Sequence, residues 1–191
     1  MKIRDFKLER FFAKYEFNVE HILCSSDCES FSIKELLDIE EGSKKKLEDV
    51  WLGYTESLGS PELRSEIAKL YEDLLSQDII VFSGAEEGIF VFMNVLLEKG
   101  DNIIVQYPAY QSLFEVANAL GCKTIKWKMN DKNNHRWDLD FEFLKENINN
   151  NTKAIIINSP HNPTGHLFTV KEFNEIIEIA RKHDLYIFSD E

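Results

Sequence analysis

Four short segments of this sequence carry residue types that could bind a small ligand. The run Ser83-Gly84-Ala85 places small residues and free backbone N–H groups at the start of a predicted helix, an arrangement that binds phosphate. Tyr110 could stack against a flat ligand, Asn162 lies in a loop rich in proline and asparagine that presents an amide, and Asp190 follows an apolar strand. A carboxylate in that position either caps the next element or faces a ligand.

Each of these features also has a purely structural explanation. A tight strand-to-helix turn accounts for the glycine run, core packing accounts for a lone tyrosine, and Asn162-Pro163-Thr164-Gly165 is a turn in any fold. Their common position favours a binding site, because each of the four segments follows the end of a predicted strand. In open α/β sheets, ligands bind outside the carboxyl ends of the strands. We therefore expect the four segments to meet at one site.

The elements that must position these residues alternate along the chain. The predicted strands cover residues 79–82, 103–105, 123–127, 153–157 and 185–189. The predicted helices between them cover residues 85–98, 109–120 and 140–146, and a last helix begins at a capping box formed by Thr169 and Glu172. The helix over 85–98 is apolar nearly all round, so we expect it to be buried. Such alternation predicts a three-layer α/β/α fold with a mostly parallel sheet.

The segment before these elements is less regular. We read residues 1–58 as an N-terminal arm, with a short helix near residues 5–17 and a polar helix near residues 32–49. Residues 59–191 form the α/β domain, which opens with a helix capped by Ser60 and started by Pro61. A polar loop is predicted over residues 130–136.

Composition narrows the function classes. The net charge of -12, from 34 acidic and 22 basic residues, opposes binding to nucleic acid or to anionic membranes. No apolar run approaches the roughly 20 residues of a membrane span, so we predict a cytoplasmic protein without membrane contact. Three cysteines do not make a disulfide framework. His21, Cys24 and Cys28 have a faintly zinc-like spacing but no fourth ligand, so we predict no metal site.

Several linked motifs together resemble fold-type I aminotransferases of class I and II. They are Ser83-Gly84-Ala85-Glu86-Glu87-Gly88, Tyr107-Pro108-x-Tyr110, Asn158-x-Pro160-x-Asn162-Pro163-Thr164-Gly165, Ser189-Asp190-Glu191, and upstream Tyr54 with Gly59, Leu63 and Arg64. The resemblance runs from about Trp51 to Glu191, and its most specific piece is the Asn-Pro-Thr-Gly segment. It implies pyridoxal 5'-phosphate (PLP) as cofactor, with amino acids and 2-oxo acids as substrates. Residues 59–191 would then be the first part of the PLP-binding large domain.

The resemblance also implies roles for residues that hold the cofactor phosphate. Gly84, Ala85 and Glu86 correspond to the turn whose backbone amides bind it, and Glu86 would use its N–H because its carboxylate repels phosphate. A tyrosine at the position of Tyr54 reaches the phosphate held by the neighbouring subunit, which implies a homodimer.

Three further residues correspond to those that bind the cofactor ring. Tyr110 would stack on the pyridine ring, Asn162 would hydrogen-bond its phenolic oxygen, and Asp190 would pair with its nitrogen. An anion beside the ring nitrogen keeps it protonated, so that the ring can accept electrons. The Asn162-Pro163 and Tyr107-Pro108 bonds are candidates for cis geometry.

The sequence departs from the family pattern after the Asp-Glu motif. In the family, the lysine that bonds to the cofactor lies tens of residues beyond that motif, and none of the lysines here has a matching position. We therefore expect no catalytic residue in this chain and no transamination by the chain alone. Ser25-Ser26-Asp27-Cys28-Glu29 stands where relatives often have a Gly-x-Pro turn, so the substrate is not readable from it.

Two other classes of function remain open on sequence alone. A non-catalytic or regulatory half-protein would keep the fold without the chemistry. A nucleotide-binding α/β domain is disfavoured, because no Gly-x-Gly-x-x-Gly and no Walker lysine is present. Among PLP-dependent reactions, decarboxylation, β-elimination and ring-forming synthesis use the same cofactor-binding residues as transamination. The fold does not distinguish between these reactions.

Overall fold

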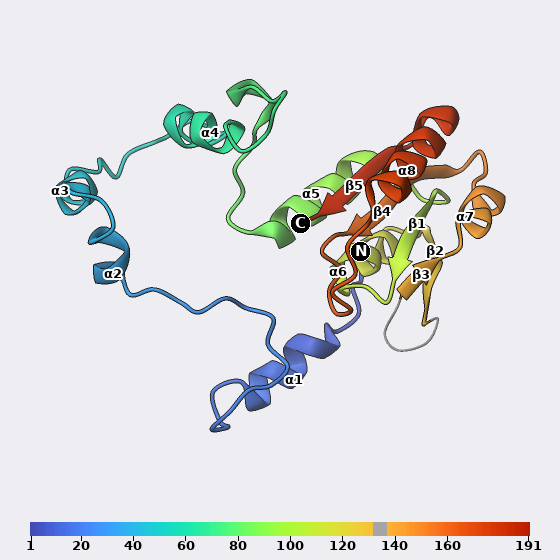
Figure 1. The fold of residues 1–191 in the computed structure, drawn as a ribbon, viewed down its shortest axis with the longest axis horizontal. Helices are drawn as coiled ribbons and strands as arrows, with labels where there is room; N and C mark the ends of the chain where they lie inside the picture. The colour runs from blue at the N-terminus through green and yellow to red at the C-terminus, as the bar shows by residue number, and fades with distance from the viewer. Residues whose placement is uncertain (132–136) are drawn as a thin grey trace. The chain divides into compact units, whose positions relative to one another are not determined.

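The computed structural model describes residues 1–131 and 137–191 (Figure 1). The chain divides into two compact units, one made of residues 1–22 and 84–191 and the other of residues 23–83. We call them the α/β unit and the helical unit. The domain division expected at residue 58 stays a prediction.

Within the described residues, the α/β unit contains a five-stranded sheet of order β3-β2-β1-β4-β5. Its strands are β1 (Asn102–Tyr107), β2 (Lys123–Asp131), β3 (Trp137–Leu139), β4 (Thr152–Asn158) and β5 (Tyr186–Asp190). All neighbouring strands run parallel except β2 and β3, which pair antiparallel. The predicted mostly parallel α/β architecture is therefore confirmed.

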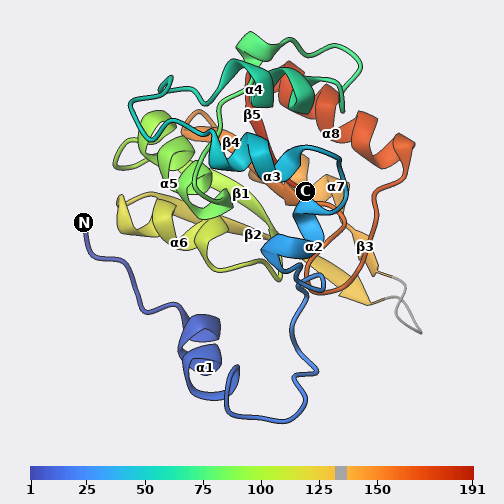
Figure 2. The same cartoon turned by 90° about the vertical axis from the view of Figure 1, so that its left-hand side faces the viewer.

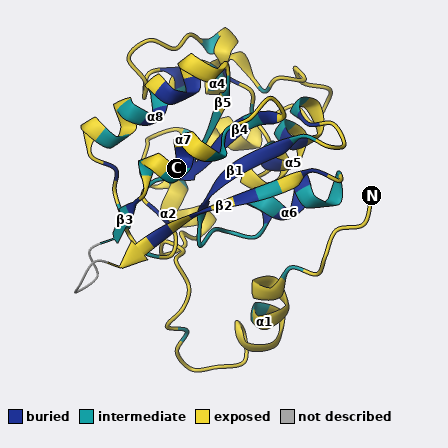
Figure 3. Ribbon diagram, turned by 90° about the vertical axis from the view of Figure 1, so that its right-hand side faces the viewer, coloured by how far each residue is buried: buried dark blue, intermediate teal, exposed yellow. Residues whose placement is uncertain are grey.

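Side chains alternate between the two faces of the sheet along each strand. Apolar side chains therefore lie on both faces, and a layer of helices covers each face. On one face, Ile103, Val105 and Ile156 pack with Met93 of α5 (Ala85–Leu96) and Leu113 of α6 (Ser112–Ala119). The central strands are buried on both sides, and dark blue runs along β1 (Figure 3). Figure 2 shows α5 and α6 on one side of β1.

The opposite face carries α7 (Phe141–Asn147) and α8 (Val170–His183). Ile104, Ile155 and Ile157 pack there with Leu144 of α7 and Ile176 of α8. The start of α8 is set by its capping box: the Thr169 hydroxyl accepts from the Glu172 N–H, and the Glu172 carboxylate accepts from the Thr169 N–H. This cap was predicted from the sequence and is confirmed.

The helical unit contains α2 (Ile33–Leu37), α3 (Ser43–Glu48), α4 (Pro61–Ala68) and a 3₁₀ turn, η1 (Ser76–Asp78). Ser60 caps α4 as predicted, accepting a hydrogen bond of 3.2 Å from the Leu63 N–H. Arg64 reaches from α4 to the carbonyls of Gly59 and Ser76. In the α/β unit, α1 (Lys7–Tyr15) confirms the short N-terminal helix.

Three sequence predictions are wrong in part. Residues 79–82 do not form a strand: the Val81 N–H bonds to the Leu58 carbonyl, and an extended segment without a neighbouring strand forms no ladder. The helix over 32–49 is two helices, separated where Gly42 adopts a positive φ of 84°. The helix over 85–98 ends at Leu96 and is buried only on its sheet side, since Val95 remains 82% exposed.

Two other boundaries shift. The helix expected from residue 109 begins at Ser112, after the turn at Pro108. Asn130 and Asp131, predicted to lie in a polar loop over residues 130–136, belong to β2 instead, and residues 132–136 lie outside the described residues.

Candidate functional site

The carboxyl ends of β1, β4 and β5 lie side by side at one edge of the sheet. β4 is hydrogen-bonded between the other two strands, and Asn158 pairs in register with Asp190. The segment after β4 therefore leaves the sheet beside the end of β5, and the segment after β1 leaves it one strand further along the same edge. Tyr110, Asn162 and Asp190 come from these three segments.

Hydrogen bonds hold the end of β5 to the start of the loop over residues 158–165. The Asp190 backbone carbonyl accepts from the Asn158 side-chain amide at 2.8 Å and from the Ser159 N–H at 3.0 Å. The Asn158 side-chain oxygen in turn accepts from the Asn162 N–H. This arrangement leaves the Asn162 side chain exposed at the edge.

A buried glutamine connects the same loop to β1. Gln106 is 1% exposed, and its side-chain oxygen accepts a hydrogen bond of 2.9 Å from the Asn158 N–H. Because a buried backbone N–H without a partner is costly, Gln106 fixes where β4 ends.

His161 joins the loops after β1 and β4. Its Nε2 lies 2.7 Å from the Pro108 carbonyl and its Nδ1 lies 2.8 Å from the Thr164 hydroxyl. A carbonyl only accepts, so Nε2 carries a proton, and in the neutral ring Nδ1 then accepts from the Thr164 hydroxyl. Burial lowers the pKa of His161, partly opposed by the Pro108 hydrogen bond, and the ring is therefore favoured in its neutral form. The bonds Tyr107-Pro108 and Asn162-Pro163 are cis, as predicted, and so is Ser159-Pro160.

The Asp190 carboxyl is half-buried at this edge. Across residues 1–131 and 137–191 we find no hydrogen bond or ion pair to its side-chain oxygens. Burial raises the pKa of Asp190 because the charged form loses hydration. A cationic group of a ligand placed here would restore the lost stabilisation of the carboxylate.

Gly84 is the N-cap residue of α5, and a Cβ atom at this position would meet open space. The short connection from Leu97 to Asn102 joins the end of α5 to the start of β1, and Phe92 packs on Phe188 of β5 at a ring-centroid distance of 4.7 Å. The helix therefore runs antiparallel to the strands, and Figure 1 shows its beginning beside the tip of β5. The backbone N–H groups of Ala85 and Glu86 are at the helix end that attracts anions.

Tyr110 lies just before α6 and contacts the N-terminal segment. Its hydroxyl donates to the Glu9 carboxylate at 3.1 Å, and its ring packs against Phe6 with a centroid distance of 4.8 Å. Tyr54 belongs to the helical unit, where its side chain is fully exposed. Tyr54 is thus not among the groups that the α/β unit brings to the sheet edge.

Sequence reasoning missed the residues that support this edge. Gln106, His161, Phe6 and Glu9 act through contacts with residues at least 52 positions away in the sequence. Gln106 alone had a readable signal, as a polar residue continuing an apolar strand.

Two kinds of feature are absent from the residues that the structure describes. They contain no group of three or more histidine, cysteine, aspartate or glutamate side chains arranged to hold a metal ion. They also contain no helix with the length and apolarity that crossing a lipid bilayer requires.

Comparison with known proteins gives consistent matches. A family model described as aminotransferase class I and II matches residues 22–191. An aspartate aminotransferase of Pyrococcus horikoshii is 35% identical over 159 residues, covering 81% of this chain and 40% of that protein. A kynurenine–oxoglutarate transaminase of Bos taurus is 34% identical over 167 residues, covering 80% of this chain and 36% of that protein.

Solved structures show the same similarity. A PLP-dependent aminotransferase from Streptococcus suis superposes with a TM-score of 0.91 at 30% identity, over 100% of this chain and 52% of that one. Cystalysin from Treponema denticola, whose crystal contains pyridoxal 5'-phosphate, superposes with a TM-score of 0.80 at 26% identity, over 98% and 48%. The chain thus spans about 40% of the length of the curated aspartate aminotransferase.

Proposed function

Because this chain belongs to the class I and II aminotransferase family, we propose that its α/β unit holds pyridoxal 5'-phosphate for the transfer of an amino group between an amino acid and a 2-oxo acid. The single observation that carries the proposal is the half-buried Asp190 carboxyl, which has no partner among the described residues and stands beside two strand-end loops. A pyridinium nitrogen supplies the positive charge that this carboxyl lacks.

The residues present fit the chemical groups of this cofactor. The N–H groups of Ala85 and Glu86 at Gly84 would bind the phosphate, and the exposed Asn162 amide would donate to the phenolic oxygen. Tyr110 would stack on the ring. When bound, the cofactor supplies an electron sink for the pair of electrons released at the substrate's α-carbon.

In this scheme Asp190 holds the proton on the ring nitrogen. The structure supports such a role through the backbone of the same residue, because its carbonyl is fixed by Asn158 and Ser159. The backbone at Asp190 is therefore held in place, and the partial burial of the carboxyl strengthens an ion pair relative to one in water.

We also propose an assembly and a cellular location for the protein. We assign Tyr54 to the cofactor phosphate of a neighbouring copy in a homodimer, as in the family pattern, and we place the protein in the cytoplasm. The full exposure of Tyr54 supports a role outside its own unit.

Titration with PLP, followed by borohydride reduction and peptide mass spectrometry, tests the proposal. We expect the chain to bind PLP, with weaker binding after Asp190→Asn, and no lysine to be trapped specifically. A specific adduct on one of the lysines present would contradict our expectation that this chain lacks the cofactor-bonding lysine. No measurable PLP binding would contradict the proposal as a whole.

A further inference from the structure

The N-terminal segment before and within α1 lies against the residues that lead into α6. The Lys7 N–H donates to the Gln111 side-chain oxygen at 3.0 Å, and the Gln111 side-chain amide donates to the Asp5 carbonyl at 2.9 Å. Gln111 thus pairs with the segment through both ends of its amide. These bonds join residues more than 100 positions apart within the α/β unit.

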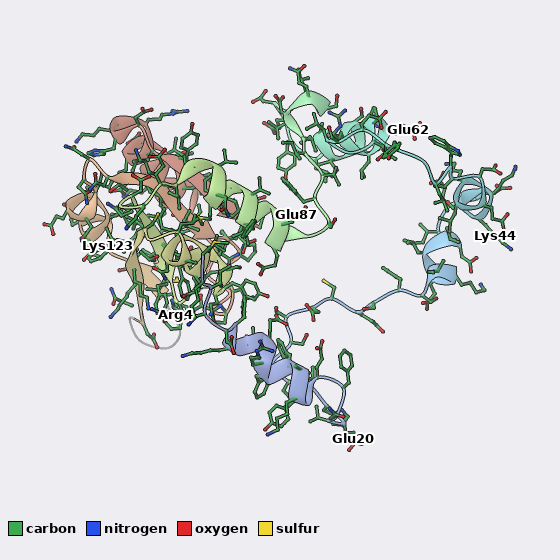
Figure 4. The ribbon with its side chains drawn as sticks, turned by 180° about the vertical axis from the view of Figure 1, so that it is seen from behind. Arg4, Glu20, Lys44, Glu62, Glu87 and Lys123 are labelled. Atoms are coloured by element: carbon green, nitrogen blue, oxygen red, sulfur yellow. The ribbon has the colours of Figure 1, made fainter. Side chains whose placement is uncertain are left out.

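An ion pair anchors the beginning of this segment. Glu115 of α6 is 4% exposed, and its carboxylate lies 3.3 Å from the guanidinium of Arg4. A buried carboxylate requires a cation or several donors, so removing the segment would leave Glu115 poorly compensated. Figure 4 shows the Arg4 side chain at the edge of the α/β unit.

The segment also faces α5, the helix whose start is assigned to the phosphate. A cavity of about 310 Å³ lies between the segment and both helices. Its lining includes Arg4 and Phe6 from the segment, Glu86 from α5, and Ser112 and Glu115 from α6. The N-terminal segment is therefore adjacent to the starts of both helices that flank the proposed cofactor.

Two side chains of the segment act on Tyr110 itself. Phe6 packs on the Tyr110 ring at 55°, and the Glu9 carboxylate accepts the hydrogen bond of the Tyr110 hydroxyl. The contact with Phe6 restricts rotation of the Tyr110 ring, and the hydrogen bond to Glu9 restricts the direction in which the Tyr110 hydroxyl points. An anionic acceptor also makes a phenol ring richer in electrons, which strengthens its attraction to a cationic ring.

We propose that Phe6 and Glu9 are positioning residues, which hold Tyr110 in the orientation that stacks on the pyridine ring of PLP. This inference rests on the proposed function, because it assigns an action on the cofactor to residues that do not touch it. It gives the N-terminal segment a part in cofactor binding rather than in folding alone.

The test measures PLP affinity and the induced circular dichroism of bound PLP, which reports the orientation of the ring. We expect Phe6→Ala and Glu9→Gln each to weaken PLP binding about three- to tenfold, the range of one aromatic or hydrogen-bonded contact, and to change the dichroism band. Phe11→Ala within α1 and Glu16→Gln directly after it are matched controls. We expect them to change the affinity less than about twofold, the range of an ordinary surface substitution.

A second arm places Glu9→Gln in a Tyr110→Phe background. Phenylalanine has no hydroxyl for Glu9 to bind, so we expect Glu9→Gln to have no further effect on affinity or dichroism there. An equal effect of Glu9→Gln in both backgrounds, or none in either, overturns the inference while the proposed function stands. Absence of PLP binding by the unaltered chain overturns the proposed function and this inference with it.

Discussion

The side-chain amide of Asn158 donates a hydrogen bond of 2.8 Å to the backbone carbonyl of Asp190, which joins the end of β4 to the end of β5. His161 extends this connection to the loop after β1 by donating to the Pro108 carbonyl. The three segments that carry Tyr110, Asn162 and Asp190 are thereby attached to one another. A disturbance in one segment is expected to reach the others.

Replacing Asp190 by asparagine is expected to have opposite effects on stability and on binding. The raised pKa of Asp190 means that the folded state holds the proton more tightly than the unfolded state. Its ionisation therefore destabilises the fold as the pH rises above the ordinary value of 3.8. Without PLP, Asp190→Asn should raise the melting temperature at pH 7, and this gain should fade as the pH falls toward that value.

The same substitution should weaken PLP binding by about tenfold or more, the scale of a charge-assisted hydrogen bond. Glu191→Gln is the matched control, because Glu191 is exposed and its side chain hydrogen-bonds only to Ser189 among the described residues. Calorimetric titration and thermal melting at two pH values measure both effects. Similar losses of affinity in the two variants would remove Asp190 from the ring-nitrogen role.

His161→Leu is expected to destabilise the α/β unit by about 1–3 kcal/mol, the cost of leaving a buried polar partner unsatisfied. The lowered pKa of His161 adds stability above the ordinary value of 6.5, and this part is lost as the pH falls through the folded-state value. The difference between wild type and variant should therefore shrink at acidic pH.

Urea unfolding followed by the fluorescence of the buried Trp127 measures this difference at pH 7.5 and 5.5. His21→Gln is the control, since the His21 side chain is 79% exposed. A pH dependence that survives in His161→Leu but disappears in His21→Gln would contradict our assignment.

Gln106→Met tests whether the buried glutamine positions the loop. Methionine keeps the volume but leaves the Asn158 N–H without its acceptor, so we expect a loss of about 1–3 kcal/mol in the free energy of unfolding. We also expect faster amide exchange at Asn158 and Ser159. Exchange unchanged at these two residues would show that another group fixes the end of β4.

Much of the fold was predictable, because it depends on local signals. The Thr169 cap of α8 and the apolar run of β4 both involve residues close together in sequence. The segment over 79–82 has the same β-branched composition but no strand beside it, and composition alone does not reveal a missing partner. β3 was missed because three residues give too short a pattern.

The residues of the candidate site also fall into those that local sequence predicts and those that it does not. Asn162 and Asp190 stand in recognisable motifs, whereas Glu9 meets Tyr110 across 101 positions of sequence. His161 occupies an unspecified position of the Asn158–Gly165 motif, and its hydrogen bond to Pro108 depends on how two loops fold together. Local sequence pattern therefore identifies the residues that we propose to face the ligand, and it misses the residues that hold them in place.

The central claim is that separate segments of the α/β unit bind one molecule of PLP. Chemical-shift mapping of the ¹⁵N-labelled chain during PLP titration tests it most directly. We expect saturable shifts that share one dissociation constant at Gly84, Ala85, Glu86, Tyr110, Asn162 and Asp190. Shifts confined to other surfaces, or different dissociation constants at the start of α5 and the end of β5, would contradict the claim.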